Sequence, residues 1–347
     1  MRESFEKRLR TFGEIAKDEK KIKKDDNGKT DEIESVLNWH LSKSAESSAT
    51  GKEVQEDIYK LQKEKQDIIE NLKSDISILD KKNIAEKISE KGREVLMAGD
   101  SMMLGEDGRP LTLGEIITDG EWDLDYSLDP GSIPRDIRKK YLVERAKIKV
   151  QKLLDEQIAL NEQNSEVVTE TKRDTYKRIT EGKNMETPGL IAEKMVRNLL
   201  KKIAIDFKTD FEIIKADVFQ DVNQKIDFII KKKILEKEER GVKVEADNDA
   251  VGIQFTINSS SHNTRHKQKQ IDYAKKDLIP GDNIKDIVLV AIPLRDINKK
   301  YNEWKKDKEP GGPDKLWSEK EKRHIFREIV NGLLPEEEVA ELSGKIK

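Results

Sequence analysis

Asp227 is the residue whose surroundings point most directly to chemistry. It stands between Ile226 and the apolar run 228–230. A carboxylate in such an apolar segment is costly to bury unless a charged partner meets it. Apolar side chains alternate along residues 225–231, which predicts a strand that carries this acid. The alternative is that Asp227 has no functional role and only caps the strand or pairs with a lysine.

A polar and basic tract, residues 258–269, forms a second candidate site. It follows a predicted strand and leads into the start of a predicted helix. Basic side chains and helix N-termini both bind phosphate groups well. We therefore predict contact with a nucleic-acid backbone through Arg265, Lys267 and Lys269. The alternative is a solvated loop and helix face without function.

Two other patterns contain metal-ligand residue types but lack the rest of a site. His262 and His266 have the spacing of zinc ligands on a helix, but Asn263 stands where the zinc-protease motif has Glu. An acidic group lacks the ordered loop of about 12 residues that binds calcium in EF-hands. We expect this group to be a solvated strand face; it consists of Glu121, Asp123, Asp125 and Asp129.

The elements that would position Asp227 and the basic tract lie in residues 187–295. Pro188 follows Thr187 and suits the first turn of a helix, and this helix carries Glu193. A fourth strand contains the unbroken apolar run 287–292, which is typical of burial on both faces. The predicted elements after the first helix are strands at 211–218, 225–231 and 251–257, a helix at 263–278 and a strand at 284–294.

This order, αβββαβ, resembles the core of the PD-(D/E)xK nuclease superfamily, the restriction-endonuclease-like fold. The resemblance covers residues 187–295 and rests on the order of elements and on Asp227 in the second strand. It implies that Asp227, together with Glu193 from the first helix, holds Mg²⁺. It also implies a lysine that positions the attacking water, while the metal lowers the pKa of that water and screens the phosphate.

The third predicted strand departs from the family pattern at two positions. Gln254 stands where the family has an acid, and Thr256 stands where it has the lysine. Glutamine offers an oxygen to a metal but no charge, and threonine cannot orient a nucleophile as a cation does. The alternative is that both belong to the polar face of a half-exposed strand, and that Glu193 is a surface helix residue.

The missing lysine has candidates elsewhere in the sequence. Lys225 and Lys231 lie two residues before and four residues after Asp227, hence on its side of a strand. Lys267 and Lys269 on the second helix are the others. The candidate catalytic residues are therefore Glu193, Asp227, Gln254, Thr256, Lys225 and Lys231, and the metal ligands are Asp227 and Glu193.

The rest of the chain is predicted to be mainly helical. Residues 1–51 predict a flexible arm, because a mixed-charge tract and a Ser-rich tract bury little surface. Apolar steps of four and three across 52–93 indicate a helix packed on its own chain or a coiled coil that forms a homodimer. The other expected segments are a helix or coiled coil over 52–97, a turn-rich part with a strand over 98–134, a long charged helix over 135–182 and a helical tail over 296–347. The N-terminal two-thirds also resembles uncharacterised helical proteins of reduced-genome bacteria, which implies no activity.

Composition narrows the classes of protein that remain. Charged residues make up 39% of the 347 residues, against about 25% in ordinary globular chains, so one large compact core is excluded. Cysteine is absent, which excludes disulfides, thiolate metal sites and cysteine nucleophiles. The net charge of −3 means that the chain lacks the overall excess of basic residues that is typical of nucleic-acid-binding proteins. No apolar run is long enough for a signal peptide or a bilayer span, so we expect a cytoplasmic protein with no membrane partner.

The expected fold class is α+β, with an extended helical N-terminal half and a C-terminal αβββαβ restriction-endonuclease-like core. The broken motif favours a degenerate, non-catalytic nuclease-fold protein that binds DNA, RNA or a protein partner. One alternative is an active Mg²⁺-dependent nuclease with a displaced catalytic lysine. The other is a helical scaffold with a protein-interaction α/β module. Mg²⁺ is the expected cofactor if the protein is catalytic, and otherwise there is none.

Overall fold

The computed structural model divides the chain into two units, Met1–Glu46 and Ser47–Lys347. All the residues that the structure describes belong to the second unit, so the predicted arm over 1–51 lies outside them. The described residues are 52–78, 85–90, 93–98, 101–102, 111–122, 135–181, 187–232, 238–239, 242–243, 250–278, 284–307, 310–331 and 333–347.

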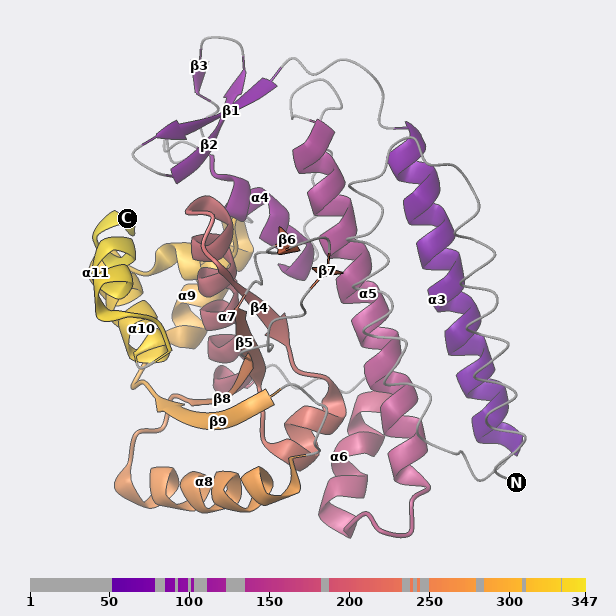
Figure 1. Cartoon of the computed structure of the whole chain (residues 1–347). Helices are drawn as coiled ribbons and strands as arrows, with labels where there is room; N and C mark the ends of the chain where they lie inside the picture. Colours follow the sequence, from indigo (N-terminus) through magenta and orange to yellow (C-terminus); the bar gives the residue numbers. More distant parts are fainter. Residues whose placement is uncertain are drawn as a thin grey trace. The chain divides into compact units, whose positions relative to one another are not determined.

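A four-stranded mixed sheet lies in the C-terminal half of the chain (Figure 1), which confirms the expected mixture of helices and strands there. Its strand order is β4-β5-β8-β9. β5 is antiparallel to both of its neighbours, β4 and β8, whereas β8 and β9 are parallel. The bounds are Phe211–Lys215 for β4, Phe228–Lys232 for β5, Ala250–Thr256 for β8 and Ile284–Ala291 for β9.

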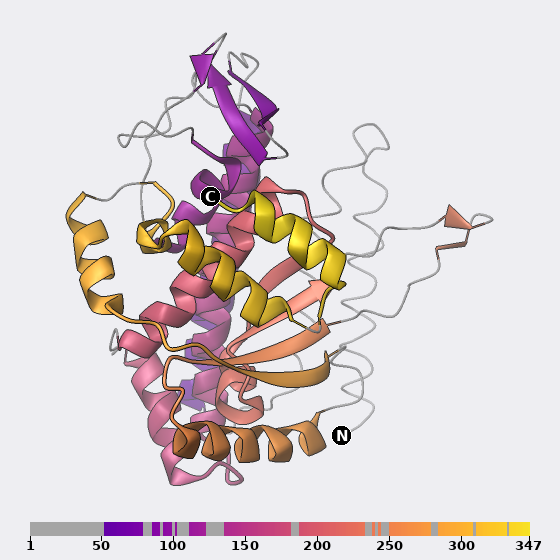
Figure 2. The same ribbon diagram turned by 90° about the vertical axis from the view of Figure 1, so that its left-hand side faces the viewer.

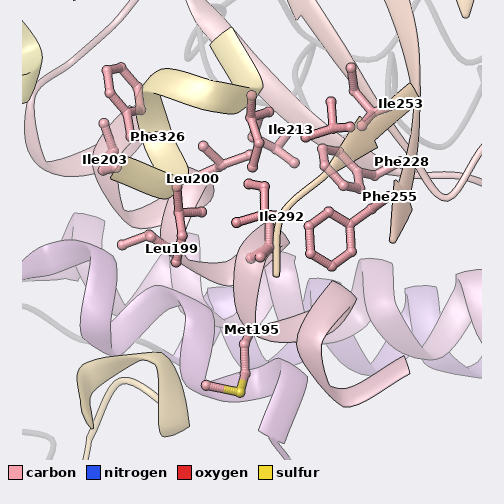
Figure 3. Close-up of a cluster of buried hydrophobic side chains, with 14 of the residues drawn as sticks. Met195, Leu199, Leu200, Ile203, Ile213, Phe228, Ile253, Phe255, Ile292 and Phe326 are labelled. Atoms are coloured by element: carbon pink, nitrogen blue, oxygen red, sulfur yellow. The ribbon is translucent and has the colours of Figure 1, made fainter. Parts of the chain in front are cut away.

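Helices cover both faces of this sheet. On one face, α7 (Pro188–Asp206) packs Met195 and Leu199 into one cluster with Phe228 and Phe255 of the strands (Figure 3). The predicted start of α7 is confirmed, because Pro188 occupies its first turn and the Thr187 hydroxyl accepts a hydrogen bond from the backbone of Leu190.

On the other face, α8 (Ser261–Ala274) packs Ile271 and Ala274 against Ile226 and Ile287. It lies beside β9 (Figure 2) and joins β8 to β9 through a short 3-10 turn, Lys275–Asp277. Gly252 in β8 is required here, because a Cβ at that position would come within 2.9 Å of the Ile226 side chain. Apolar side chains thus fix the sheet between two helices.

The connection between β4 and β5 differs from the predicted strands. β4 ends at Lys215, and a π-helical turn, Gln220–Gln224, follows. Lys225 closes the turn in the left-handed region with a φ of 60°, so the chain enters β5 only at Phe228. The expectation that Asp227 lies within the strand is therefore wrong by one residue: Asp227 immediately precedes β5.

The predicted helix over 52–93 is wrong beyond its first part. Helix α3 spans Lys52–Ile78, and β1 (Ala85–Glu90) then pairs antiparallel with β2 (Arg93–Ala98), followed by β3 (Ser101–Met102). Glycine in a helix interior is unfavourable, and Gly92 stands inside the range that was predicted as helix. Helix α3 packs on α5 of the same chain and buries Lys65 and Leu72, which supports the intrachain alternative for this helix.

The predicted long helix over 135–182 consists of two helices. Helix α5 spans Arg135–Gln163 and α6 spans Glu170–Thr180. The intervening residues are rich in Asn, Ser and Thr, whose side chains compete for backbone hydrogen bonds, and Asn164 donates to the carbonyl of Leu160. The expected solvated strand face is wrong at Glu121, which is buried in a 3-10 turn, Asp119–Trp122; residues 123–134 lie outside the described residues.

The remaining elements are short. The helical tail is confirmed as α9 (Ile297–Asp307), α10 (Glu319–Val330) and α11 (Glu336–Lys345), with a 3-10 turn at Pro313–Leu316. Helix α4 (Leu113–Thr118) was not predicted, and β6 (Glu238–Glu239) pairs with β7 (Val242–Lys243). Within the described part of the chain, none of the helices combines the length and the apolar character that a bilayer span requires.

Candidate functional site

Asp227 is fixed at the end of β5 by two contacts with β8. Its backbone N–H donates to the carbonyl of Ile253 at 2.8 Å, and its Oδ2 accepts from the N–H of Phe255 at 2.6 Å. The antiparallel register pairs Phe228 with Ile253, so its continuation places Asp227 opposite Gln254. The predicted acid and the predicted glutamine are therefore neighbours across two strands.

Gln254 is buried with one polar atom unsatisfied. Its side chain is 7% exposed, and its Oε1 has no hydrogen-bond partner in the part of the chain that the structure describes. Strand side chains alternate, so Gln254 shares the α8 face with Gly252 and Thr256. A buried acceptor without a donor is costly, and it is suited to a ligand that brings positive charge.

Thr256 is engaged in the loop after β8 rather than in the site. Its hydroxyl accepts from the backbone N–H of Asn258 at 3.3 Å and lies 3.5 Å from the amide nitrogen of Asn263. These contacts stabilise the entry into α8, whose N-cap is Ser260. Thr256, which the resemblance predicted to stand in place of a catalytic lysine, thus has a structural role here.

Glu193 lies on α7 and forms an ion pair with Arg197 of the same helix. Its Oε1 accepts from Nη1 of Arg197 at 2.9 Å. Burial nevertheless raises the pKa of Glu193 to about 7, because it outweighs Arg197 and because the negative Asp221 adds to it. Glu193 therefore exchanges a proton near neutral pH.

The pKa of Asp227 is raised well above its usual value by burial, then by the negative charges of Glu193 and Asp221. The N–H of Phe255 and the ammonium of Lys267 offset this only in part. The two acids expected to form the site are thus close enough to repel each other. Such a cluster is short of positive charge.

Asp221 is a member of this cluster that sequence reasoning missed. It lies on the π-helical turn, and its side chain is exposed. Surrounding protein atoms still raise its pKa, although Lys215 and Lys225 act in the opposite direction. π-helical turns often occur at functional sites, but hydrophobic periodicity gives no signal for them. The sequence showed Asp221 only as an acidic residue and gave no indication that it belongs to the site.

Two of the candidate lysines reach the cluster. Lys267 on α8 donates to the carbonyl of Phe255 at 3.3 Å, next to the contact that holds Asp227. Lys225 donates to the carbonyl of Val222 at 2.7 Å. Burial, and then the charge of Lys172, lower the pKa of Lys225, although Asp221 and Asp227 act in the opposite direction.

The other predicted cations are not brought into the cluster. Lys231 pairs across the sheet with Glu212 and Ala250. It lies four residues from Asp227, about 13 Å along a strand. Arg265 and Lys269 are exposed on α8, whereas Lys267 is half-buried. They are available on the outer surface of the helix but do not touch the acids.

The acidic residue Glu121 serves the fold rather than calcium binding. It is buried, and its Oε1 lies 2.9 Å from the ammonium of Lys201 and 3.6 Å from Arg197. Burial alone would raise the pKa of Glu121, but Lys201 and Arg197 outweigh it and lower the pKa to about 2. The other three members, Asp123, Asp125 and Asp129, lie outside the described residues.

The cluster offers oxygen ligands to a metal ion, but its described residues do not bring three acids together around one position. Among the described side chains, no group of three or more His, Cys, Asp or Glu residues is arranged to hold a metal ion. Mg²⁺, however, is usually bound by one or two carboxylates, with waters filling the other positions. Asp227, Glu193 and the unsatisfied Oε1 of Gln254 match that smaller donor set.

Comparisons with protein-family models, with curated proteins and with solved structures found no match for this chain. Fold and site therefore define the protein only as a mixed α/β protein. Its sheet carries an acidic cluster with a lysine from α8 at one end.

Proposed function

We propose that the protein is a divalent-metal-dependent phosphodiesterase that acts on nucleic acid, with a restriction-endonuclease-like core. The observation that carries the proposal is that Glu193, Gln254 and Lys267, from three different elements, each neighbour Asp227. Lys267 is the displaced lysine that the active alternative requires, since Thr256 cannot fill that role. This observation favours the active alternative over the non-catalytic interpretation.

A magnesium ion fits the residues that are present. Two carboxylates with raised pKa values repel each other, and the buried oxygen of Gln254 has no donor among the described residues. A bound cation would reduce the repulsion between the two carboxylates and would give the oxygen of Gln254 a positively charged partner. Asp227, Glu193 and Gln254 would hold the ion, and bound Mg²⁺ supplies a water of lowered pKa and charge to neutralise a phosphate.

The chain's own groups have separate tasks in this proposal. Asp227 is held by two backbone contacts, so its carboxylate is oriented before any ligand arrives. Glu193 has a pKa of about 7 without a metal, so it would release its proton when the ion binds and then serve as a ligand. The ammonium of Lys267 lies beside Asp227, where it can orient a water and stabilise the negative charge that develops on a phosphate.

The non-catalytic alternative keeps one specific observation in its favour. Two positions of the family motif lack charge, because Gln254 is neutral and Thr256 is used by the loop before α8. A protein that binds nucleic acid without cutting it would have no need for either charge. The same assay separates the two functions.

The test incubates the full chain with labelled single- and double-stranded DNA and RNA, in Mg²⁺, in Mn²⁺ and in EDTA. We expect metal-dependent cleavage that falls at least about 100-fold in Asp227→Asn and in Lys267→Met, since each removes a charge at the reacting phosphate. Asp272→Asn on α8 is the matched control, because it removes one exposed carboxylate outside the cluster.

Each outcome has a distinct meaning. No cleavage by the wild-type chain, together with salt-sensitive binding, would establish the non-catalytic alternative. Cleavage that survives Asp227→Asn would show that another site is responsible. Neither binding nor cleavage would leave the protein-interaction alternative.

A further inference from the structure

Three lysines surround the π-helical turn, and each is held by a neutral oxygen. Lys172 on α6 donates to Oδ1 of Asn223 at 2.6 Å. Lys225 donates to the carbonyl of Val222 at 2.7 Å, and Lys267 on α8 donates to the carbonyl of Phe255 at 3.3 Å. Only the last two were among the residues that the sequence suggested.

These contacts bring the three ammonium groups to one side of the acidic cluster. Lys172 and Lys225 bind adjacent residues of the same turn, Asn223 and Val222. Helix α8 packs against this turn, and its Lys267 binds the strand residue that also holds Asp227. Three elements far apart in the sequence thus supply positive charge to one place.

None of these three lysines forms a direct ion pair with a carboxylate of the described residues, although all three are half-buried. Other lysines nearby do form such pairs, as Lys215 does with Asp155 at 3.1 Å. Half-buried ammonium groups that lie together repel each other, and an anionic ligand removes that repulsion.

The backbone at Lys225 is a second indication of function. Its φ of 60° is a conformation that Gly or Asn adopts at lower cost than lysine. Residues in such conformations cluster at ligand sites, where the side chain repays the strain. Here the side chain returns over the turn and donates to the carbonyl of Val222.

We infer that Lys172, Lys225 and Lys267 form a binding site for the phosphates of a nucleic-acid strand, next to the acidic cluster. Helix α6 then contributes directly to substrate binding, although it lies outside the αβββαβ core. The identity of the anion as nucleic acid rests on the proposed function. The lysine cluster itself does not depend on whether the protein cleaves.

The experiment measures binding of the full chain to fluorescently labelled single-stranded and double-stranded oligonucleotides in EDTA, over a series of salt concentrations. The variants are Lys172→Gln and Lys225→Gln. Lys177→Gln is the matched control, because Lys177 lies on the same helix, is exposed and pairs with Glu181. Lys225→Asn suits the left-handed backbone and serves as a second variant if Lys225→Gln unfolds.

Each phosphate contact contributes about 0.9 to the slope of log affinity against log salt for duplex DNA, and about 0.7 for single strands. Loss of one contact should therefore reduce the affinity change between 50 and 200 mM salt by about 3-fold. We expect this reduction in Lys172→Gln and in Lys225→Gln but not in Lys177→Gln.

The inference is overturned if both variants behave like Lys177→Gln, even when the wild-type chain cleaves. It is also overturned if the wild-type chain binds none of the oligonucleotides. Conversely, a chain that does not cleave but loses binding in both variants would refute the proposed function and leave the phosphate site in place.

Discussion

At the scale of single residues, the cluster is defined by acids that face one another without enough positive charge. Among the described residues, Arg197 is the direct ion-pair partner of Glu193, and Arg197 also lies 3.6 Å from Glu121. Asp227 is stabilised by a backbone N–H, which carries no net charge. Folding therefore holds these acids in an arrangement that favours their protonated forms.

The first prediction concerns Asp227→Asn and the pH dependence of stability. The folded pKa of Asp227 is raised, so its contribution to stability is complete below the unfolded pKa and is lost as pH rises through the folded pKa. In EDTA, Asp227→Asn should melt higher than wild type at pH 8 and close to it at pH 4. Each kcal/mol of relief corresponds to about 2–4 °C in melting temperature.

Thermal melts at the two pH values, with Asp272→Asn as the control, check this prediction. An equal change at pH 4 and pH 8 would mean that Asp227 is not under electrostatic strain. The stabilised variant should also be the inactive one, which separates stability from function.

The second prediction concerns Gln254→Glu. This change adds a buried negative charge next to Asp227, so it should lower the melting temperature in EDTA at pH 8. It should also make the rise in melting temperature on adding Mg²⁺ larger than in wild type, because three acids then attract the cation. Gln268→Glu on the exposed side of α8 is the control. A Mg²⁺ response no larger than that of wild type would place the Gln254 oxygen outside the site.

Residue types in the sequence were sufficient to identify some members of the site but not others. Asp227 could be recognised because an acid in an apolar run needs a partner, and Glu193 followed from the family resemblance. Asp221 and Lys172 could not, since each is an ordinary charged residue in a charged neighbourhood. Their role depends on a π-helical turn and on the docking of α6, which have no local sequence pattern.

At the scale of elements, the helices before the sheet position the loop that carries the site. Asp155 on α5 accepts from the backbone N–H of Val218 at 3.0 Å and from Lys215 at 3.1 Å. On α6, the hydroxyl of Tyr176 accepts from Asn223 at 2.6 Å. The segment between β4 and β5 is therefore held by two helices as well as by the sheet.

The third prediction is that Asp155→Ala weakens this connection. It leaves the buried N–H of Val218 without its partner, which should cost about 1–3 kcal/mol of unfolding free energy. Cleavage should also fall, because Asp221 and Lys225 lie on the same connection. Denaturant unfolding and the cleavage assay test both effects, and Asp174→Ala on the exposed side of α6 is the control. Wild-type stability in Asp155→Ala would contradict the proposed docking.

Periodicity was reliable for elements where the pattern was long and uninterrupted. The four strands of the sheet occur close to where alternation and a continuous apolar run predicted them. Periodicity failed over 52–93, because the helical spacing of apolar residues ends at Leu79 and the prediction extended the helix beyond it, into the paired strands β1 and β2. It also could not detect the break between α5 and α6, where charged residues suit either helix or loop.

At the scale of the whole molecule, a buried polar network joins distant parts of the Ser47–Lys347 unit. The carboxylate of Asp314 accepts from Lys202 at 2.6 Å and from Asn198 at 2.8 Å, both on α7. The N–H of Gly311 donates to Asp119 at 2.6 Å. These contacts connect residues about 110 and 190 positions apart, so the segments before and after the sheet are tied to the helix that carries Glu193.

The fourth prediction is that Asp314→Ala destabilises the whole Ser47–Lys347 unit. Breaking a buried ion pair on one side leaves an uncompensated charge, here on Lys202, at a cost of about 3–5 kcal/mol. Denaturant unfolding should show one earlier transition, with Asp307→Ala on α9 as the exposed control. A small change would show that the network contributes little to holding the two segments on α7.

The raised pKa values of Glu193 and Asp227 have a thermodynamic consequence for any cation that enters. With a pKa of about 7, Glu193 is partly protonated at neutral pH, where an ordinary carboxylate has lost its proton, and the pKa of Asp227 is raised in the same direction. Loading the cluster with a metal would therefore expel protons into the medium. The heat of binding measured by calorimetry should then vary with the ionisation enthalpy of the buffer, and the affinity should increase on the alkaline side of neutrality.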